Sequence, residues 1–288
     1  MIAARDSGAA LAAPAHPFFG RRAVIASKHG KERALYAPLR EELGLFPEVL
    51  LLETDRFGTF TGEVPRAGSQ LDALRAKLRE AADATPYDAV IVASEGSFFP
   101  DPAFAHATLN RELVALYDPQ REIEIVGSAV GPARHVGAFD VATADDLDAA
   151  LARLGVPAHG IVVFDGARHY KGVRDRAALL RLVADCRSRG ANVRIESDLR
   201  AHMHPTRMEQ ITAAALDAAK RARSRCPHCS RPGYWRTDFI AGLPCSTCGE
   251  ATSRTRSEVW SCIGCSKREE RASIIASADP ADCTTCNP

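Results

Sequence analysis

The chain has 288 residues, of which 46% are hydrophobic and 25% are charged, with 37 Lys and Arg against 36 Asp and Glu. This composition excludes a wholly disordered protein and is typical of a soluble protein with one good-sized core and a smaller second unit. No apolar run approaches the roughly 18 residues that a membrane helix needs, so a membrane protein is not expected.

Residues 1–19 are rich in Ala and Pro, and Arg5 and Asp6 interrupt them. No continuous apolar segment follows, so we expect a flexible tail rather than a signal peptide. We therefore expect a cytoplasmic protein.

Residues 20–222 alternate between strand-like and helix-like segments. Strands are expected at 22–27, 48–53, 88–93, 122–127, 160–164 and 192–196. The apolar centres of the second, third and fifth predict strands buried on both faces. The fourth alternates polar and apolar residues, which predicts an antiparallel or edge strand.

Helices are expected between these strands. Ser69 precedes leucines at helical spacing and is an expected N-cap. Thr143 with Asp146, and Thr206 with Glu209, have the spacing of capping boxes. Strands separated by such helices predict an α/β domain, a largely parallel sheet with helices on both faces.

Residues 223–288 form an expected second domain that is rich in cysteine. Eight of the nine cysteines occur there as C-x-x-C pairs: Cys226/Cys229, Cys245/Cys248, Cys262/Cys265 and Cys283/Cys286. Two such pairs complete a tetrahedral four-thiolate site, so the spacing predicts a zinc-ribbon module with two Zn²⁺ ions. Sequential, crossed and nested pairings all fit the spacing. Cys186 is expected to lie in the core.

The sequence leaves two roles open for this module: a structural or docking role, and nucleic-acid binding. Zn²⁺ held by four thiolates has no open position for catalysis, which favours a structural or docking role. From Asp217 onward there are 11 Lys or Arg and 8 Asp or Glu. Eight thiolates around two Zn²⁺ turn this formal charge of +3 into about −1, whereas nucleic-acid binders have a basic excess. Nucleic-acid binding is therefore possible but not favoured.

Three polar stretches directly follow expected strands, which places them at one edge of the sheet, where α/β proteins bind ligands. The first, 26–32, contains His29 and Lys31 at the start of a helix and predicts an anion site. The second, 54–63, contains Asp55, two glycines and several hydroxyls. The third contains Glu95 among small residues.

A fourth stretch, 196–204, alternates acidic and basic residues. If it is extended, one face carries Glu196, Asp198, Arg200, His202 and His204. Acids for Mg²⁺ and cations for phosphate are the groups that phosphate-ester chemistry needs.

Several of these motifs together resemble an uncharacterised bacterial family of domain-of-unknown-function proteins, number 6671. The resemblance extends from residue 22 almost to the end of the chain and rests on SKHGKE (27–32), TDRFGTFTGEVPR (54–66), ASEGSF (93–98), ESDLRAHMHPTRM (196–208) and CTTCNP (283–288). It implies no particular reaction.

The stretch SKHGKERALYAPLREELG, followed by ALRAKLREA and ASEGS, resembles the layout of the inosine-triphosphate pyrophosphatase-like enzymes. This resemblance implies that Lys31 contacts phosphate and that Glu95 helps to hold Mg²⁺. The chain departs from that pattern at His29, where those enzymes typically have Asn, and in having Glu95 alone where they have paired acids.

We therefore expect the α/β domain to be a Mg²⁺-dependent enzyme, a nucleotide phosphohydrolase, that acts on a nucleotide or another phosphate-bearing small molecule. Its expected catalytic or metal-binding residues are Glu95, Asp55 and Asp198. Its expected substrate-binding residues are His29, Lys31, Thr61, Glu63, Ser97, Arg200 and Arg207. The alternative is a non-enzymatic binding module, in which the zinc ribbons contact nucleic acid or a protein partner.

Overall fold

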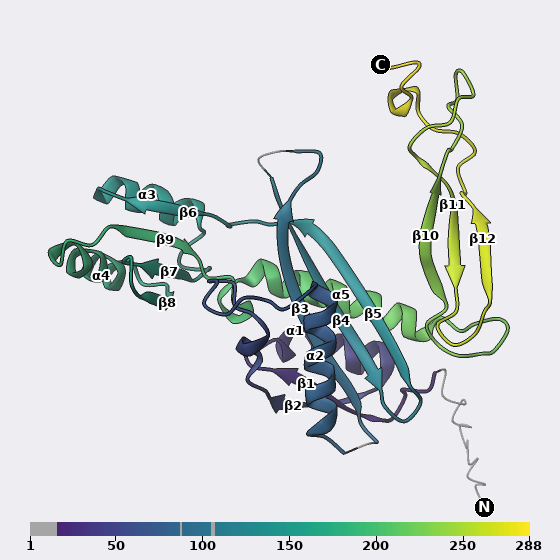
Figure 1. Cartoon of the computed structure of the whole chain (residues 1–288), viewed down its shortest axis with the longest axis horizontal. Coiled ribbons are helices and arrows are strands. Elements are labelled where there is room, and N and C mark those ends of the chain that lie inside the picture. Colours follow the sequence, from purple (N-terminus) through teal and green to yellow (C-terminus); the bar gives the residue numbers. More distant parts are fainter. Residues whose placement is uncertain (1–15, 87, 105–106) are drawn as a thin grey trace, which may run out of the picture. The chain divides into compact units, whose positions relative to one another are not determined.

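The computed structural model describes residues 16–86, 88–104 and 107–288, which form two compact units (Figure 1). The larger unit is Gly20–Ala219, and the smaller contains Lys220–Pro288 together with residues 16–19. Residues 1–15 of the expected tail lie outside the described residues. The domain boundary expected at residue 223 stays a prediction.

The first sheet of the larger unit has five strands in the order β2-β1-β3-β4-β5. Its strands are β1 (Arg22–Ser27), β2 (Phe46–Leu51), β3 (Val90–Pro100), β4 (Thr108–Asp118) and β5 (Ile123–Pro132). β1 pairs in parallel with β2 and β3, whereas β3, β4 and β5 are antiparallel to one another. The sheet is therefore mixed, and the prediction of a largely parallel sheet is wrong.

Two strand predictions fail for identifiable reasons. β4 was not expected, because its Arg, Glu, Leu and Ala residues favour helix locally; pairing with strands on both sides overrides that preference. The prediction that β2 is buried on both faces is wrong, because it is an edge strand and four of its six residues are exposed. The prediction for β5 is confirmed, since it is both antiparallel and at the other edge.

Two helices cover opposite faces of this sheet. α2 (Gln70–Asp83) begins at the expected N-cap Ser69, whose hydroxyl accepts a hydrogen bond from the Asp72 backbone N–H. Its apolar side packs against the sheet, on the face that carries Ile91 and Ala115. Gly127 pairs with Val114, which lies on the opposite face from Ala115, and on that face Gly127 meets α5 (Pro205–Arg223).

α5 (Pro205–Arg223) approaches the sheet very closely, because a Cβ at Gly127 would overlap backbone atoms of Ala214 and Ala218. The predicted capping box at Thr206 is wrong. The helix already begins at Pro205, and the Thr206 hydroxyl pairs with the His204 ring instead. Proline at the first helical position is favourable, because its missing N–H would have no partner there.

The second sheet of the larger unit is antiparallel throughout, with the strand order β6-β9-β7-β8. Its strands are β6 (Ala138–Val141), β7 (Ile161–Phe164), β8 (His169–Val173) and β9 (Val193–Ser197). α3 (Ala144–Arg153) and α4 (Arg176–Ser188) pack on it around a core that includes the fully buried Cys186, as expected. The capping box of Thr143 and Asp146 is also confirmed.

Short helical segments complete the larger unit. They are α1 (Glu32–Ala37), the π-helical turn Pro38–Glu42 and the 3₁₀ turns Thr54–Phe57 and Ala201–Met203. The shared face considered for residues 196–204 depended on an extended chain. β9 ends at Ser197 and the second 3₁₀ turn follows, so the alternating side chains do not share one face.

The smaller unit contains an antiparallel sheet of three strands, β10 (Trp235–Ala241), β11 (Thr255–Ser261) and β12 (Arg268–Ala272), followed by a 3₁₀ turn at Pro280–Asp282. Tyr234 and Trp260 pack at this sheet, with the Arg271 guanidinium 4.3 Å from the centre of the Trp260 ring. Within the described part of the chain, no helix is long and apolar enough to cross a membrane.

Candidate functional site

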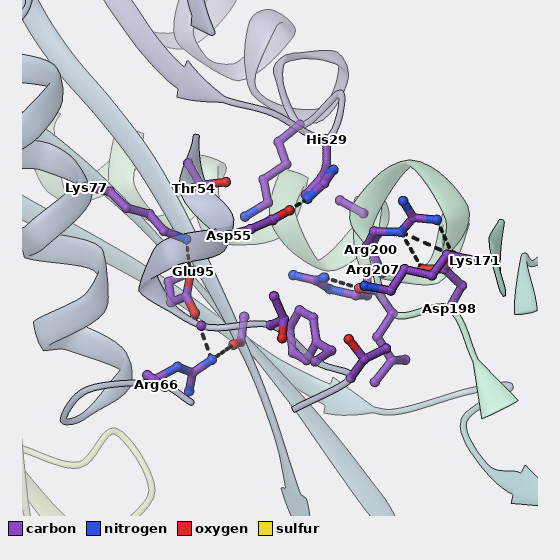
Figure 2. A pocket seen from close by; sticks show the side chains of 18 residues that line it. His29, Thr54, Asp55, Arg66, Lys77, Glu95, Lys171, Asp198, Arg200 and Arg207 are labelled. Carbon is purple, nitrogen blue, oxygen red and sulfur yellow. Dashed lines mark hydrogen bonds and ion pairs between the residues drawn. The ribbon is translucent and has the colours of Figure 1, made fainter. Parts of the chain in front are cut away.

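A pocket in the larger unit collects most of the predicted site residues (Figure 2). The empty space inside it, counted out to its open mouth, is about 820 Å³. Six cationic side chains and three carboxylates line it: Lys31, Arg66, Lys77, Lys171, Arg200 and Arg207, with Asp55, Glu95 and Asp198. Such a lining favours an anionic ligand.

Lys31 is the cation in this pocket that has no carboxylate partner. Among the described residues it forms no ion pair, and its ammonium group donates a hydrogen bond of 3.1 Å to the backbone carbonyl of Ser94. Burial, reinforced by the positive charges of Lys77 and Arg207, lowers the pKa of Lys31 to about 7. A bound anion would supply the missing negative charge and favour the protonated ammonium.

Glu95 lies in the middle of β3 rather than beyond the end of a strand. Side chains of a strand alternate between its faces, so Glu95 shares the α2 face with Ile91 and Ala93. There one carboxylate oxygen pairs with Lys77 of α2, and the other accepts a hydrogen bond of 2.7 Å from Arg66. Although burial opposes ionisation, the charges of Lys77 and Lys31 hold the pKa of Glu95 below its usual value.

Arg207 and Glu112 form a second buried ion pair, on the opposite face of the same sheet. Arg207 Nε lies 2.7 Å from a Glu112 oxygen, and both side chains are almost completely buried. Glu112 pairs in register with Gly96, and a side chain at Gly96 would collide with both charged groups. Above the guanidinium lies the Phe60 ring, whose centre is 4.6 Å from Cζ.

The second sheet contributes Arg200, Asp198 and Lys171 to the pocket. Asp198 follows β9, and Arg200 binds it with two hydrogen bonds, 2.9 Å from Nε and 2.6 Å from Nη2. Lys171 of β8 pairs with Glu63, which belongs to the loop that follows β2. Both sheets therefore hold this loop at the mouth of the pocket.

His29 and Asp55 form a hydrogen-bonded pair at the pocket wall, with 2.9 Å between His29 Nε2 and an Asp55 oxygen. Burial lowers the pKa of His29, so the imidazole is neutral at pH 7. With Asp55 ionised, Nε2 carries the hydrogen and Nδ1 keeps its lone pair. The His202 ring stacks on His29 at 5.2 Å between centres.

The pocket brings together eight of the ten residues that were predicted for the α/β site: His29, Lys31, Asp55, Thr61, Glu95, Asp198, Arg200 and Arg207. Ser97 does not line it. Glu63 is not part of the lining either, but it bonds the lining residues Lys171 and Thr61. The roles assigned to these residues stay predictions.

Sequence reasoning missed Arg66, Lys77, Lys171 and Phe60, which also line the pocket. For Lys77 a signal existed: it occupies the apolar stripe of α2 beside Leu74 and Leu78, where a lysine needs a buried partner. Lys171 had no such signal, because only the tertiary fold brings β8 to this place.

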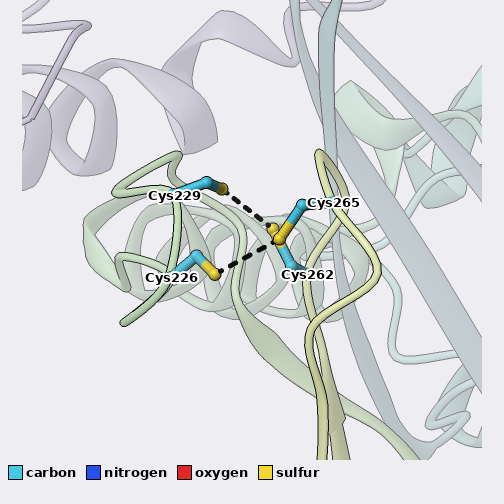
Figure 3. A group of neighbouring side chains, drawn as sticks. All are labelled: Cys226, Cys229, Cys262 and Cys265. Atoms are coloured by element: carbon cyan, nitrogen blue, oxygen red, sulfur yellow. Dashed lines mark hydrogen bonds between the residues drawn. The ribbon is translucent and has the colours of Figure 1, made fainter.

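The smaller unit contains two groups of four cysteines, and the pairing is crossed. Cys226, Cys229, Cys262 and Cys265 form one group (Figure 3), and Cys245, Cys248, Cys283 and Cys286 form the other. The sheet explains this pairing. In three antiparallel strands, the start of β10 lies at the same end as the β11–β12 turn, and the end of β12 lies with the β10–β11 turn.

Both groups fit Zn²⁺. Sulfurs at the corners of a tetrahedron around Zn²⁺ are about 3.8 Å apart. The pair Cys226–Cys265 is separated by 3.8 Å and Cys229–Cys262 by 3.6 Å. In the other group, the corresponding distances are 3.9 Å and 3.6 Å. The prediction of two sites that can hold zinc is therefore confirmed at the level of geometry.

The thiols of the first group influence one another strongly. Burial and the neighbouring sulfurs raise the pKa of Cys262 to about 12. Burial also acts to raise the pKa of Cys226, but the backbone N–H groups of Cys229 and His228 bring it down to about 6. Four thiolates this close need a cation to offset their charge, and Zn²⁺ provides it.

The chain was compared with curated proteins, solved structures and protein families. No curated protein matches the chain. A crystal structure of a nucleoside-triphosphatase / dITP/XTP pyrophosphatase from Mycobacterium abscessus matches with 17% identity and a TM-score of 0.27, covering 38% of this chain and 71% of that one. A model of one family, described as a domain of unknown function (DUF6671), matches residues 77–288. The chain therefore belongs to the DUF6671 family.

Proposed function

We propose that the pocket of the larger unit binds a phosphate-bearing small molecule, with a nucleotide as the expected class. The observation that carries this proposal is Lys31, a buried ammonium group that faces the pocket region without a carboxylate partner. Burying a charge is costly unless it is paired, so a partner that arrives with the ligand is expected. Phosphate oxygens supply that partner.

Other lining residues support this ligand class. Arg200 bonds Asp198 through Nε and Nη2 and not through Nη1, which leaves Nη1 to donate to a ligand. A guanidinium group is suited to phosphate. Phe60 is 40% exposed at the pocket, where its ring offers an apolar surface to a base or another planar group. The lining thus has a cationic part and an aromatic part.

We further propose that the unit hydrolyses this ligand and that Mg²⁺ arrives bound to the phosphates. Both oxygens of Glu95 already accept hydrogen bonds from cations, and so do both oxygens of Asp198. Both oxygens of Asp55 are also paired, with His29 and with Lys28, but its side chain is 39% exposed and Lys28 is itself partly exposed, so Mg²⁺ would displace the Lys28 ammonium group there; Asp55 is therefore the carboxylate expected to meet the ion. His29, oriented by Asp55, would take the proton from the attacking water.

The test is a screen of the full-length protein against nucleoside triphosphates with Mg²⁺, in which phosphate and pyrophosphate release is measured. We expect turnover with at least one nucleotide. Asp55→Asn should lower kcat by about 100-fold or more, the range of general acid–base contributions, while binding is retained. Arg75→Met is the matched control, because Arg75 pairs with Glu124 away from the pocket.

Two outcomes would count against this function. Binding without turnover would leave a ligand-binding protein and remove the hydrolase. Failure of every nucleotide and of pyrophosphate to bind would remove the phosphate ligand as well.

The smaller unit is proposed to have a structural role, with Zn²⁺ stabilising a sheet too small to fold alone. Several of its basic side chains are paired with carboxylates: Arg236 with Glu258, Arg254 with Asp282 and Arg271 with Glu269. This pairing disfavours the alternative of nucleic-acid binding. A reducing cytoplasm, where thiols stay available to Zn²⁺, is the proposed setting.

A further inference from the structure

Three histidines from distant parts of the sequence lie against one another outside the pocket. His135 is in the connection from β5 to β6, His159 lies between α3 and β7, and His204 directly precedes α5. The ring centres of His135 and His159 are 4.5 Å apart, and those of His159 and His204 are 4.7 Å apart. The pocket lining includes none of the three.

All three imidazoles use Nδ1 in the same way, since each Nδ1 faces an oxygen. His135 Nδ1 lies 3.1 Å from the carbonyl of Arg153, and His159 Nδ1 lies 3.4 Å from the carbonyl of Gly155. His204 Nδ1 lies 3.0 Å from the hydroxyl of Thr206. A carbonyl only accepts, so Nδ1 of His135 and His159 carries the hydrogen and Nε2 keeps the lone pair. Metal-binding histidines typically have this arrangement.

The Nε2 atoms of His159 and His204 are buried, and neither has a hydrogen-bond partner among the described residues. The residues themselves are 6% and 1% exposed. A buried polar atom without a partner is costly and calls for an explanation. A metal ion would satisfy both atoms at once.

Gly155 allows two of the rings to come this close. A Cβ at this position would lie 2.8 Å from Nδ1 of both His135 and His159. The residue has a φ of +69°, which glycine adopts without strain. The position therefore favours glycine for its conformation and for the space that the two imidazoles need.

We propose that His135, His159 and His204 form a third metal site, which takes a borderline divalent ion such as Zn²⁺ through three Nε2 atoms. Imidazole nitrogens suit this class of ion. Glu209 or water supplies the fourth ligand, as in other sites with three protein ligands.

The site closes by a movement of one side chain. Among the described residues, only the two cysteine groups already have their ligand atoms within 4.8 Å of one another. His135 is exposed, and its ring would turn toward the two buried Nε2 atoms at the cost of its present hydrogen bond to the Arg153 carbonyl; its exposure gives the ion a path from solvent.

The position of this site suggests what it does. The chain leaves the first sheet for the second at His135, and it returns toward α5 at His204. An ion bound to both residues joins the two connections between the sheets. It therefore fixes the arrangement of the sheets, both of which contribute residues to the pocket.

The test is equilibrium dialysis of the full-length protein against buffered Zn²⁺ at about 10 µM free ion, followed by measurement of bound metal. The proposal expects about three Zn²⁺ per wild-type chain and about two for His159→Gln and for His204→Gln. His169→Gln is the matched control, because His169 lies on β8 and packs on Phe164 outside the cluster. This variant should keep all three ions.

A measurement on the wild-type protein alone guards against variants that fail to fold. Zn²⁺ added beyond two equivalents should shift the NMR signals of three histidine rings and raise the thermal unfolding midpoint. The proposal is overturned if the wild-type chain stops at two equivalents with its histidine signals unchanged. It is equally overturned if a third equivalent survives both His159→Gln and His204→Gln.

Discussion

Lys31 shows how a binding group lowers the stability of the fold that holds it. The pKa of Lys31 is about 7 in the folded chain, whereas a lysine in the unfolded chain has its ordinary value near 10.5. Between these values the unfolded state binds more protons, so this residue makes stability rise with pH. Near neutral pH the buried amine of Lys31 therefore lowers the free energy of unfolding.

Replacing Lys31 by methionine should consequently stabilise the protein. We expect Lys31→Met to raise the free energy of unfolding by at least about 1 kcal/mol at pH 7, with a smaller gain at pH 9.5. Urea unfolding at the two pH values measures this. A loss of stability at pH 7, or a gain that grows with pH, would contradict the burial of a charged amine.

Glu95 should behave in the opposite way, because two cations depend on it. Glu95→Gln leaves Lys77 and Arg66 without their carboxylate and should destabilise the fold by about 3 kcal/mol, as breaking a buried ion pair does. Glu124→Gln is the control, since Glu124 pairs with Arg75 near the surface, and it should cost less than about 1 kcal/mol. Equal effects in urea unfolding would show that the Glu95 pair is not buried.

At the residue scale, the sequence indicated the pocket better than it indicated its chemistry. Lys31, Asp55 and Glu95 were expected together because polar stretches that follow neighbouring strands meet at one edge. The ion pairs could not be expected, because Lys77 and Arg66 reach Glu95 only through the packing of α2 and the preceding loop. Those pairs make Glu95 the centre of an ion-pair cluster, while its expected role stays a prediction.

At the scale of elements, the contact between α5 and β5 depends on a glycine. Gly127→Ala would place a methyl group into the backbone of α5 and should destabilise the fold by about 3 kcal/mol. Gly131→Ala, in the same strand, would meet only the end of the flexible Gln210 side chain and should cost less than about 1 kcal/mol. Thermal unfolding of both variants checks this, and a mild Gly127→Ala would mean that α5 lies farther from the sheet.

The crossed pairing of cysteines has an equally direct test. Cys229→Ser with Cys262→Ser damages one group and leaves the other complete, so one of the two cysteine-bound Zn²⁺ ions should remain per chain. Cys229→Ser with Cys248→Ser damages both groups and should remove both cysteine-bound ions. Sequential pairing gives the reverse result, and elemental analysis of the purified variants distinguishes the two.

Elements with a local signal were predicted well, and those without one were not. Ser69 and Thr143 mark helix starts through their own side chains, so α2 and α3 could be read from the sequence. β4 carries helix-forming residues and exists because β3 and β5 pair with it. The crossed zinc pairing likewise follows from strand direction, which C-x-x-C spacing does not contain.

At the scale of the whole molecule, the pocket belongs to neither sheet alone. Lys31 and Asp55 lie in the segments that follow β1 and β2 of the first sheet. Lys171 lies in β8 of the second sheet and Arg200 follows its strand β9, while Glu63 of the loop after β2 pairs with Lys171. A sequence predicts which residues follow a strand, but not how two sheets of one unit meet. That is why the contribution of β8 was missed.

The central claim is that Lys31 binds the phosphate of a ligand, and a calorimetric titration with pyrophosphate at pH 6, 7 and 8.5 tests it most directly. Because the ligand needs the protonated amine and its pKa is about 7 in the protein, wild-type affinity should fall about tenfold per pH unit above 7, with proton uptake on binding. Lys31→Met should show no measurable binding, whereas Arg75→Met should match the wild type. Unchanged affinity in Lys31→Met, or wild-type affinity that does not fall between pH 7 and 8.5, would contradict the account.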